Sequence, residues 1–392
     1  MNCYLFAHSK PVLILLIVLS LFINACDSDI NSPKNTYEVL FDSTYYVGGQ
    51  WSEASDILEV SSGGFIIAGR IGGQGNSAAL LRINDNGNQV WKNIYSGSRL
   101  QSVIETNDNG FVAVGKSETG AYILKTDQHG NVVWEQTIDF FPYVEDIRKV
   151  IQTADGDLIV PINSYEVNTN AKLVRLSSGG SIKWTKNIEG VNRTYIYAVS
   201  EEPSGNLKLL GGSNIDSAAT GWLLTLDRNG TELNRNLINT NISAIGSTWH
   251  ELSTIRNNTG GFAGVGWEFF IVTDSSGNLN YKNAIPTPYG YDQIRLYSLF
   301  QKNNNEYIAG GFLSEWVKDD STNVWSSQTF GGLFFLNSEG VLTGNIVLNK
   351  KCNNNSVTSV IVSRDNSILA SGYYSSCDST RVEFWVQKIR ML

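Results

Sequence analysis

The sequence predicts an all-β fold made of short antiparallel strands joined by tight turns. The chain of 392 residues contains 37 Gly but only 7 Pro, and charged residues make up 17% of it. Its abundant Gly, Asn, Ser, Trp and Tyr suit short strands separated by turns. Strand-like segments also recur at a mean spacing of about 50 residues, which is typical of repeat architectures.

The first repeated element is a short apolar strand that usually ends in Gly and follows a turn rich in Asp, Asn or Gly. Such a run between turn signals predicts a strand. Seven copies occur: GFIIAG (64–69), GFVAVG (110–115), DLIVP (157–161), NLKLLG (206–211), GFAGVG (261–266), EYIAGG (306–311) and SILASG (367–372).

A hairpin follows each of the first six copies, and a further strand precedes every copy. The hairpin is an apolar strand, a turn containing Gly and a second strand that often ends in an aromatic residue. Examples are ALLRINDNGNQVW (79–91), YILKTDQHGNVVW (122–134) and KLVRLSSGGSIKW (172–184), and preceding strands include SDILEV (55–60) and SVIETN (102–107). Four strands per repeat describe the blade of a propeller.

We therefore predict a seven-bladed β-propeller of four-stranded antiparallel blades over residues 36–392. The seventh repeat ends after its third strand, EFWVQKI (383–389), and TYEVLF (36–41) can supply the fourth. Pairing of this N-terminal strand in the last blade would close the ring and remove two exposed sheet edges. The repeat resembles those of quinoprotein-like tandem-repeat propellers. This resemblance implies architecture but carries no catalytic residue across, and we expect no cofactor.

The N-terminus predicts export. One positive charge, Lys10, precedes an apolar run over residues 11–23 that is too short to span a membrane and suits a signal peptide. The run ends in INAC, which resembles the lipobox of bacterial lipoproteins. The resemblance implies that residues 1–25 are a signal peptide and Cys26 is lipidated. Residues 26–35 then read as a flexible tether, and we expect a lipid-anchored protein of the outer membrane, on its periplasmic or cell-surface face. An ordinary secretory signal with an incidental Cys is the alternative.

Cys352 and Cys377 are the cysteines left after Cys3 is removed with the signal peptide and Cys26 is lipidated. In an oxidising compartment, a remaining pair predicts a disulfide. With three His and no close Cys/His spacing, we expect no metal site. The net charge of −8 argues against nucleic acid. We expect a monomer that contacts the membrane only through its anchor.

Functional residues are expected on the face that carries the loops of variable length. These loops join the second strand to the third and one repeat to the next, and range from GKSETG (115–120) to the long segment 312–330. Aromatic faces beside carboxylates suit a sugar ring, although the aromatics could instead fill the space between blades and the acids could cap turns. The predicted ligand-binding residues are Trp51, Glu53, Tyr143, Glu145, Asp146, Trp249, His250, Glu251, Tyr291 and Asp292.

The sequence favours a binding or scaffolding protein for a glycan or a protein partner. No G-x-S-x-G, H-E-x-x-H or P-loop motif is present, so no catalytic residue is assigned. The alternative is a polysaccharide hydrolase or lyase that uses carboxylates at the mouth of the central channel. Two acids converging at about 5–10 Å would favour the hydrolase, whereas acids scattered around a rim would favour binding.

Overall fold

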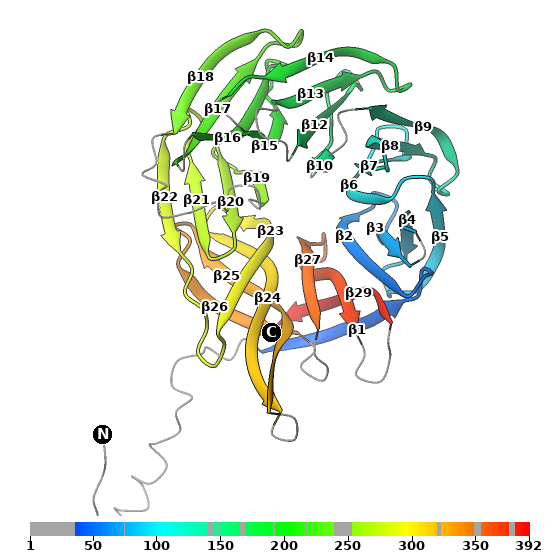
Figure 1. Cartoon of the computed structure of the whole chain (residues 1–392), viewed down its shortest axis with the longest axis vertical. Helices are drawn as coiled ribbons and strands as arrows, with labels where there is room; N and C mark the ends of the chain where they lie inside the picture. Colours follow the sequence, from blue (N-terminus) through cyan, green and yellow to red (C-terminus); the bar gives the residue numbers. More distant parts are fainter. Residues whose placement is uncertain are drawn as a thin grey trace, which may run out of the picture. The chain divides into compact units, whose positions relative to one another are not determined.

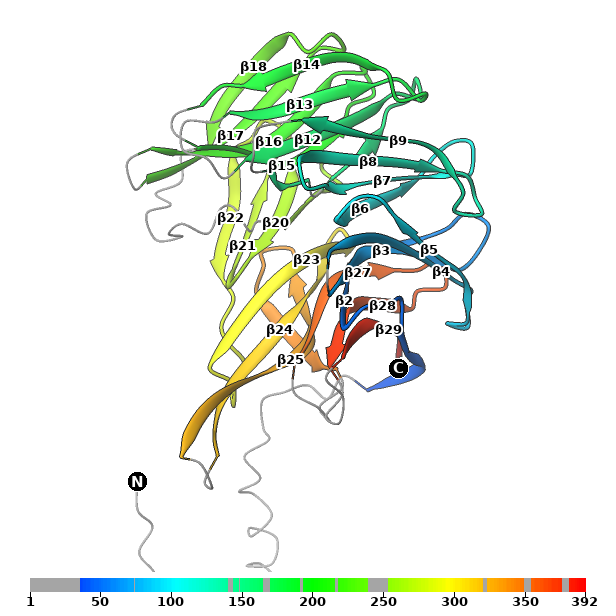
Figure 2. The ribbon, with the colours of Figure 1, turned by 45° about the vertical axis from the view of Figure 1, so that its right-hand side comes forward.

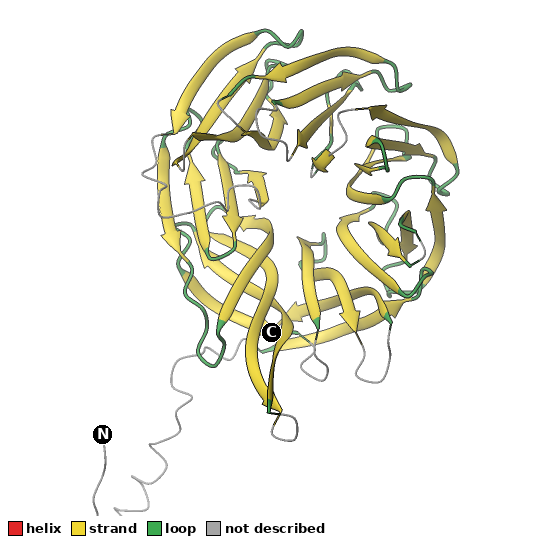
Figure 3. Cartoon of the chain, in the orientation of Figure 1, coloured by secondary structure: helices red, strands yellow, loops and turns green. Residues whose placement is uncertain are grey.

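The computed structural model describes residues 36–392 apart from 74, 140–143, 148, 165–169, 191–192, 216–217, 239–252, 320–322, 349–353 and 376–380. Asn35–Leu392 form one compact unit. The described residues contain strands and turns but no helix (Figure 3). No helix long and apolar enough to cross a membrane is present in this part of the chain.

Five sheets stand alone, and within each the strands are antiparallel and follow one another in chain order. The first is β6 (Arg99–Glu105), β7 (Phe111–Lys116), β8 (Gly120–Thr126) and β9 (Val132–Asp139), and in the second β10 (Val144–Asp146) and β11 (Ile151–Gln152) both pair with β12 (Leu158–Ser164), which is followed by β13 (Ala171–Leu176) and β14 (Ile182–Ile188). The third is β15 (Arg193–Glu201), β16 (Leu207–Ile215), β17 (Ala218–Leu226) and β18 (Glu232–Ile238), and the fourth is β19 (Ser253–Arg256), β20 (Phe262–Gly266), β21 (Phe269–Thr273) and β22 (Leu279–Ala284). The fifth is β23 (Gln293–Asn303), β24 (Glu306–Asp319), β25 (Val324–Asn337) and β26 (Leu342–Val347).

The remaining eight strands form one sheet that combines both ends of the unit. They are β1 (Tyr37–Tyr45), β2 (Trp51–Glu59), β3 (Phe65–Gly72), β4 (Ser77–Ile83), β5 (Gln89–Tyr95), β27 (Asn355–Val362), β28 (Ile368–Ser375) and β29 (Val382–Met391). Its order is β27-β28-β29-β2-β3-β4-β5, and β1 pairs with β29. A single parallel residue pair, Trp51 with Val382, joins β29 to β2.

The sheets are arranged around a central axis as the four-stranded antiparallel blades of a β-propeller (Figure 1). Strands β2, β6, β10, β15, β19, β23 and β27 lie nearest the axis. The prediction of seven separate blades is not reproduced sheet for sheet, because five blades stand alone and the other eight strands are continuous. The physical reason is the backbone pairing at Trp51, which joins the first strands of the unit to the last.

The N-terminal strand pairs with the C-terminal one, as the sequence predicted. Tyr37 lies opposite Met391 and Tyr45 opposite Phe384 in an antiparallel ladder. Asp42 fixes this pairing, because its carboxylate accepts hydrogen bonds from Trp385 Nε1 at 2.7 Å and from Gln387 Nε2 at 3.1 Å.

Recurring aromatic side chains pack between neighbouring sheets. The ring at the end of one hairpin covers the turn glycine of the next, as Trp91 covers Gly130 and Trp134 covers Gly180. A Cβ on Gly130 would lie 2.8 Å from the Trp91 ring, so this packing leaves no room for a side chain. The repeated Gly and Trp of the sequence are therefore the two halves of one contact between sheets.

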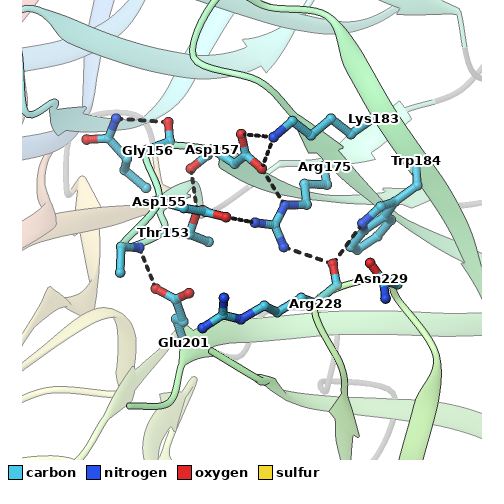
Figure 4. Close-up of polar contacts among 12 residues, drawn as sticks. Thr153, Asp155, Gly156, Asp157, Arg175, Lys183, Trp184, Glu201, Arg228 and Asn229 are labelled. Atoms are coloured by element: carbon cyan, nitrogen blue, oxygen red, sulfur yellow. Dashed lines mark hydrogen bonds and ion pairs between the residues drawn. The ribbon is translucent and has the colours of Figure 1, made fainter. Parts of the chain in front are cut away.

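Buried cations stabilise the turns that join first and second strands, at the edge opposite the variable loops. The ion pairs are Lys125 with Asp108 at 2.7 Å, Arg175 with Asp155 at 2.6 Å and Lys388 with Asp365 at 2.8 Å. Figure 4 shows Arg175 between Asp155 and Asp157, with Lys183 also bound to Asp157. The cations of these pairs are about 5% exposed, so each is paired where it is buried.

The longest predicted loop, residues 312–330, is instead largely a two-stranded ribbon. Strands β24 and β25 continue beyond the ends of β23 and β26, with Trp316 opposite Ser327 and Lys318 opposite Trp325. Figure 2 shows this ribbon extending beyond the other strands. Because side chains alternate along a strand, Trp316 and Trp325 lie on the same face, and they are 58% and 59% exposed.

Candidate functional site

Five of the predicted site residues can be placed with their side chains. Trp51, Glu53, Asp146, Tyr291 and Asp292 are described. Glu145 lies in β10, but only its backbone is described. The others lie outside the described residues: Tyr143, Trp249, His250, Glu251, Cys26, Cys352 and Cys377.

Trp51 and Glu53 come together with an arginine that the sequence did not single out. Glu53 lies opposite Arg70 in the β2–β3 ladder. Arg70 donates to Glu53 Oε2 from Nη2 at 2.8 Å and from Nε at 3.1 Å. The Arg70 guanidinium carbon lies 3.8 Å from the centroid of the Trp51 ring. Indole, guanidinium and carboxylate therefore form one stacked unit at the start of β2.

A second arginine approaches the same carboxylate. Arg99, the first residue of β6, places Nη2 3.4 Å from Glu53 Oε1. Burial lowers the pKa of Arg70, the Glu53 carboxylate opposes that shift, and the Arg99 charge adds to it. Two arginines around one carboxylate leave a local excess of positive charge.

Tyr373, on β28, also lies close to Glu53, since β28 contacts β2. Burial raises the pKa of its phenol to about 12, and the nearby Tyr297 and Glu53 add to that effect. Tyr373 therefore stays protonated at neutral pH and can donate a hydrogen bond.

Equivalent positions on the inner strands explain why these residues meet. Ladders β2–β3, β6–β7, β23–β24 and β27–β28 each contain a register shift that begins one residue after Glu53, Arg99, Arg295 and Ser356 respectively. The residues opposite them are Arg70, Lys116, Phe312 and Tyr373. Strands β6, β2, β27 and β23 are consecutive around the axis (Figure 1). We call Arg99, Glu53, Ser356 and Arg295, with the residues opposite them, the inner arc.

Asp146 has a different role. Asp146 is only 5% exposed, and its carboxylate accepts a hydrogen bond from Gln101 Nε2. Gln101 Oε1 in turn accepts from the Ile147 N–H at 3.3 Å. Asp146 therefore links two neighbouring sheets.

Tyr291 and Asp292 are also engaged by the fold. The Tyr291 ring packs edge-on against Phe330, with centroids 6.1 Å apart. Asp292 Oδ2 accepts from the Trp316 N–H at 2.7 Å, at the base of the β24–β25 ribbon. Of the predicted residues that can be placed, Trp51 and Glu53 lie together around Arg70, and the other three make separate contacts.

The residues that lie opposite Glu53, Arg295 and Ser356 were not predicted from the sequence. Arg70, Phe312 and Tyr373 each directly follow the Gly of a first-element repeat. This repeated offset was a usable signal, because equivalent positions of a repeat lie at one level around the axis. No group of His, Cys, Asp and Glu suited to hold a metal ion occurs among the described residues.

No protein-family model and no curated protein matches the sequence. Solved structures do match. A protein of unknown function from Dyadobacter fermentans superposes with a TM-score of 0.50 at 12% identity, covering 91% of this chain and 99% of that one. BBS1N, solved in complex with ARL6DN, gives a TM-score of 0.53 at 11% identity, covering 89% and 96%. The Dos1 propeller gives 0.48 at 13% identity, covering 86% and 77%. At these identities the likeness concerns the fold alone, and the chain is a β-propeller.

Proposed function

We propose that the protein is a binding protein whose variable face takes up a glycan. The observation that carries this proposal is that each described carboxylate of the predicted site is already engaged. Glu53 binds two arginines, Asp146 binds Gln101, and Asp292 caps the ribbon. A glycoside hydrolase needs one carboxylic acid and a second carboxylate free to act on substrate or water, so the described geometry favours binding over hydrolysis.

The chemistry of the inner arc suits a saccharide. Trp51 and Tyr373 are partly exposed aromatics, and aromatic faces pack on the C–H faces of sugar rings while polar groups fix orientation. Arg70 and Arg99 supply several N–H donors for hydroxyl oxygens. The paired strands of the propeller hold these groups in place.

The direct test is a glycan array probed with the wild-type chain and with two variants. Trp51→Ala removes the indole that stacks on Arg70 of the inner arc, and we expect it to weaken binding at least tenfold. Trp325→Ala removes an exposed indole from the ribbon and should bind like wild type. Equal binding by wild type and Trp51→Ala, or release of shortened sugars from a bound polysaccharide, would contradict the proposal.

A protein partner is the second candidate, and the β24–β25 ribbon favours it. Trp316 and Trp325 are exposed on one face of a projecting strand pair, and exposed aromatics are enriched at protein interfaces. A partner whose binding is lost in Trp316→Ala and retained in Trp51→Ala would support this role.

The proposal includes the finer architecture of seven blades. The eight-stranded sheet divides at Trp51 into β27–β28–β29–β1 and β2–β5, each with four strands. A repeated hydrogen bond supports this division, in which a side chain at or near the end of an inner strand accepts a hydrogen bond from a turn N–H of the preceding unit. The pairs are Ser61 to Glu105, Asn107 to Gln152, Ala154 to Glu201, Asn258 to Gln301 and Arg364 to Glu59.

The proposal also places the protein on the outer membrane through lipidated Cys26, as a monomer with a Cys352–Cys377 disulfide. The INAC motif and the even cysteine pair support it. Cys26→Ser should move the protein from the membrane fraction to the soluble fraction. Peptide mapping without reductant should yield a linked peptide that contains Cys352 and Cys377.

A further inference from the structure

Arg295 occupies the inner arc without a carboxylate partner among the described residues. On β23 it lies opposite Phe312. Its guanidinium carbon is 4.2 Å from the Trp267 ring centroid and 5.9 Å from that of Phe312. Its buried Nε makes no hydrogen bond, and no acid of the described chain forms an ion pair with it. A guanidinium held between aromatic rings with an unused donor is suited to receive an anionic acceptor.

Trp267 beside it has two unusual features of its own. Its buried Nε1 also lacks a hydrogen-bond partner. Its φ is +20°, which is rare outside glycine. The Trp267 carbonyl accepts the Leu296 N–H at 3.1 Å, which fixes this turn against the next sheet. Unsatisfied buried donors and backbone strain tend to concentrate at ligand sites.

Arg99 repeats the pattern at the other end of the inner arc. It occupies the position on β6 equivalent to Arg295 on β23, and its buried Nε likewise has no partner. Its contact with Glu53 is the longer one, because Arg70 holds that carboxylate at 2.8 Å. The inner arc therefore contains three arginines and one carboxylate, in a protein whose net charge is −8. Such a local reversal of sign attracts and orients anions.

Resting on the proposed glycan-binding function, we infer that the glycan is acidic and that its anionic group binds the arginines of the inner arc. Arg295 and Arg99 supply N–H donors for the acidic group. Trp267 Nε1 and the Tyr373 hydroxyl bind neighbouring ring oxygens. The indole of Trp51 packs on an adjoining sugar ring.

The experiment compares three tetrasaccharides by isothermal titration calorimetry with the full chain in detergent. One is a tetragalacturonate, the second is its methyl ester, which has the same rings without charge, and the third is a sulfated galactan tetrasaccharide. We expect the acid to bind at least tenfold more tightly than the ester. The affinity for the acid should fall with added salt and that for the ester should not.

Variants assign the effect to the inner arc. Arg295→Met keeps an apolar stem against Trp267 and should remove most of the preference for the acid. Glu53→Gln removes the competing carboxylate and should strengthen acid binding. Arg390→Met, which removes a half-exposed arginine on β29, is the matched control and should leave both affinities unchanged. Thermal unfolding of each variant checks that it is folded.

The possible outcomes distinguish failure of this inference from failure of the proposed glycan binding. Equal affinities for acid and ester would overturn the inference while the proposed glycan binding stands. Binding of the sulfated sugar alone would support an acidic ligand and assign its charge to sulfate. Absence of binding to these sugars and to every neutral glycan on the array would overturn both. An acid preference that survives in Arg295→Met and in Arg99→Met would place the anion elsewhere and overturn the inference.

Discussion

At the residue scale, glycine and tryptophan of the repeated hairpin define the contact between neighbouring sheets. Gly130 has a φ of +80°, and the Trp91 ring lies over it. Both residue types recur in the hairpin repeat of the sequence. It could not show that the Trp of one repeat meets the Gly of the next, because that contact depends on how the sheets pack.

Replacing Gly130 by Ala tests this contact against a matched glycine. Gly156 has a similar φ of +88°, but a Cβ there meets only open space up to 4.0 Å. We expect Gly156→Ala to lower the free energy of unfolding by about 1 kcal/mol through backbone strain. Gly130→Ala should lower it by a further ~1–3 kcal/mol because the methyl group overpacks the indole. Urea unfolding measures both, and equal losses would contradict the packing.

The turn acids make stability depend on acid pH. Burial alone would raise the pKa of Asp108, but hydrogen bonds from Lys125, Thr106 and the Gly110 N–H outweigh it and lower the pKa to about 2. The unfolded value is about 3.9. The stabilisation is therefore fully present above about pH 4 and is lost as the pH falls through about 2.

Asp108→Asn should accordingly lower the urea concentration at the midpoint of unfolding at pH 7. Between pH 4 and 2, this midpoint should fall less in the variant than in wild type. The effect is modest, since the Asp108 side chain is 65% exposed and solvent screens the pair. Asp139→Asn, at an exposed position on β9, is the control. A decline as steep in Asp108→Asn as in wild type would contradict this assignment.

At the element scale, β1 connects the two ends of the propeller. The sequence predicted this pairing because the last repeat lacked a strand and the N-terminus supplied one. It could not predict the β24–β25 ribbon, since residues 312–330 lack the repeat pattern and strand pairing there depends on register. The repeated hydrogen bond from a turn N–H to the neighbouring inner strand is replaced in one unit. There the turn residue is Pro203, which has no N–H to donate. Arg256, at the position of the usual acceptor, donates instead to the Glu201 carbonyl at 2.8 Å.

Asp42→Ala tests the closing strand. The change removes the acceptor of Trp385 Nε1, and Trp385 is fully buried. We expect a loss of about 1–3 kcal/mol in the free energy of unfolding, as for other buried donors left unsatisfied. Glu38→Ala on the same strand removes only an exposed pair with Arg390 and should cost less than about 1 kcal/mol. Equal effects in urea unfolding would show that Asp42 does not hold β1 in place.

At the scale of the whole molecule, the start of β1 and the inner arc lie at opposite edges of the sheets. β1 begins at Tyr37, opposite Met391, and its other end at Tyr45 lies opposite Phe384, beside Val382 and Trp51. With the proposed lipid at Cys26, we expect the inner arc to remain accessible. The lipidated chain in nanodiscs and Cys26→Ser in solution should bind a given glycan with affinities within about twofold, measured by calorimetry. A large loss in nanodiscs would indicate that the membrane covers the site.

The candidate site was only partly predictable at this scale. Trp51 and Glu53 stood out as an aromatic and an acid on a variable loop. Arg99 and Arg295 are isolated cations in the sequence, and only the alignment of inner strands around one axis places them at equivalent positions. Their unsatisfied donors are visible only in three dimensions.

A crystal structure of the chain with a bound acidic oligosaccharide tests the central claim most directly. We expect the anionic group within hydrogen-bond distance of the Arg295 or Arg99 guanidinium and a sugar ring against Trp51 or Trp267. A sugar bound on the opposite edge of the sheets, or one whose acidic group points to solvent while the arginines keep their unsatisfied donors, would contradict the account.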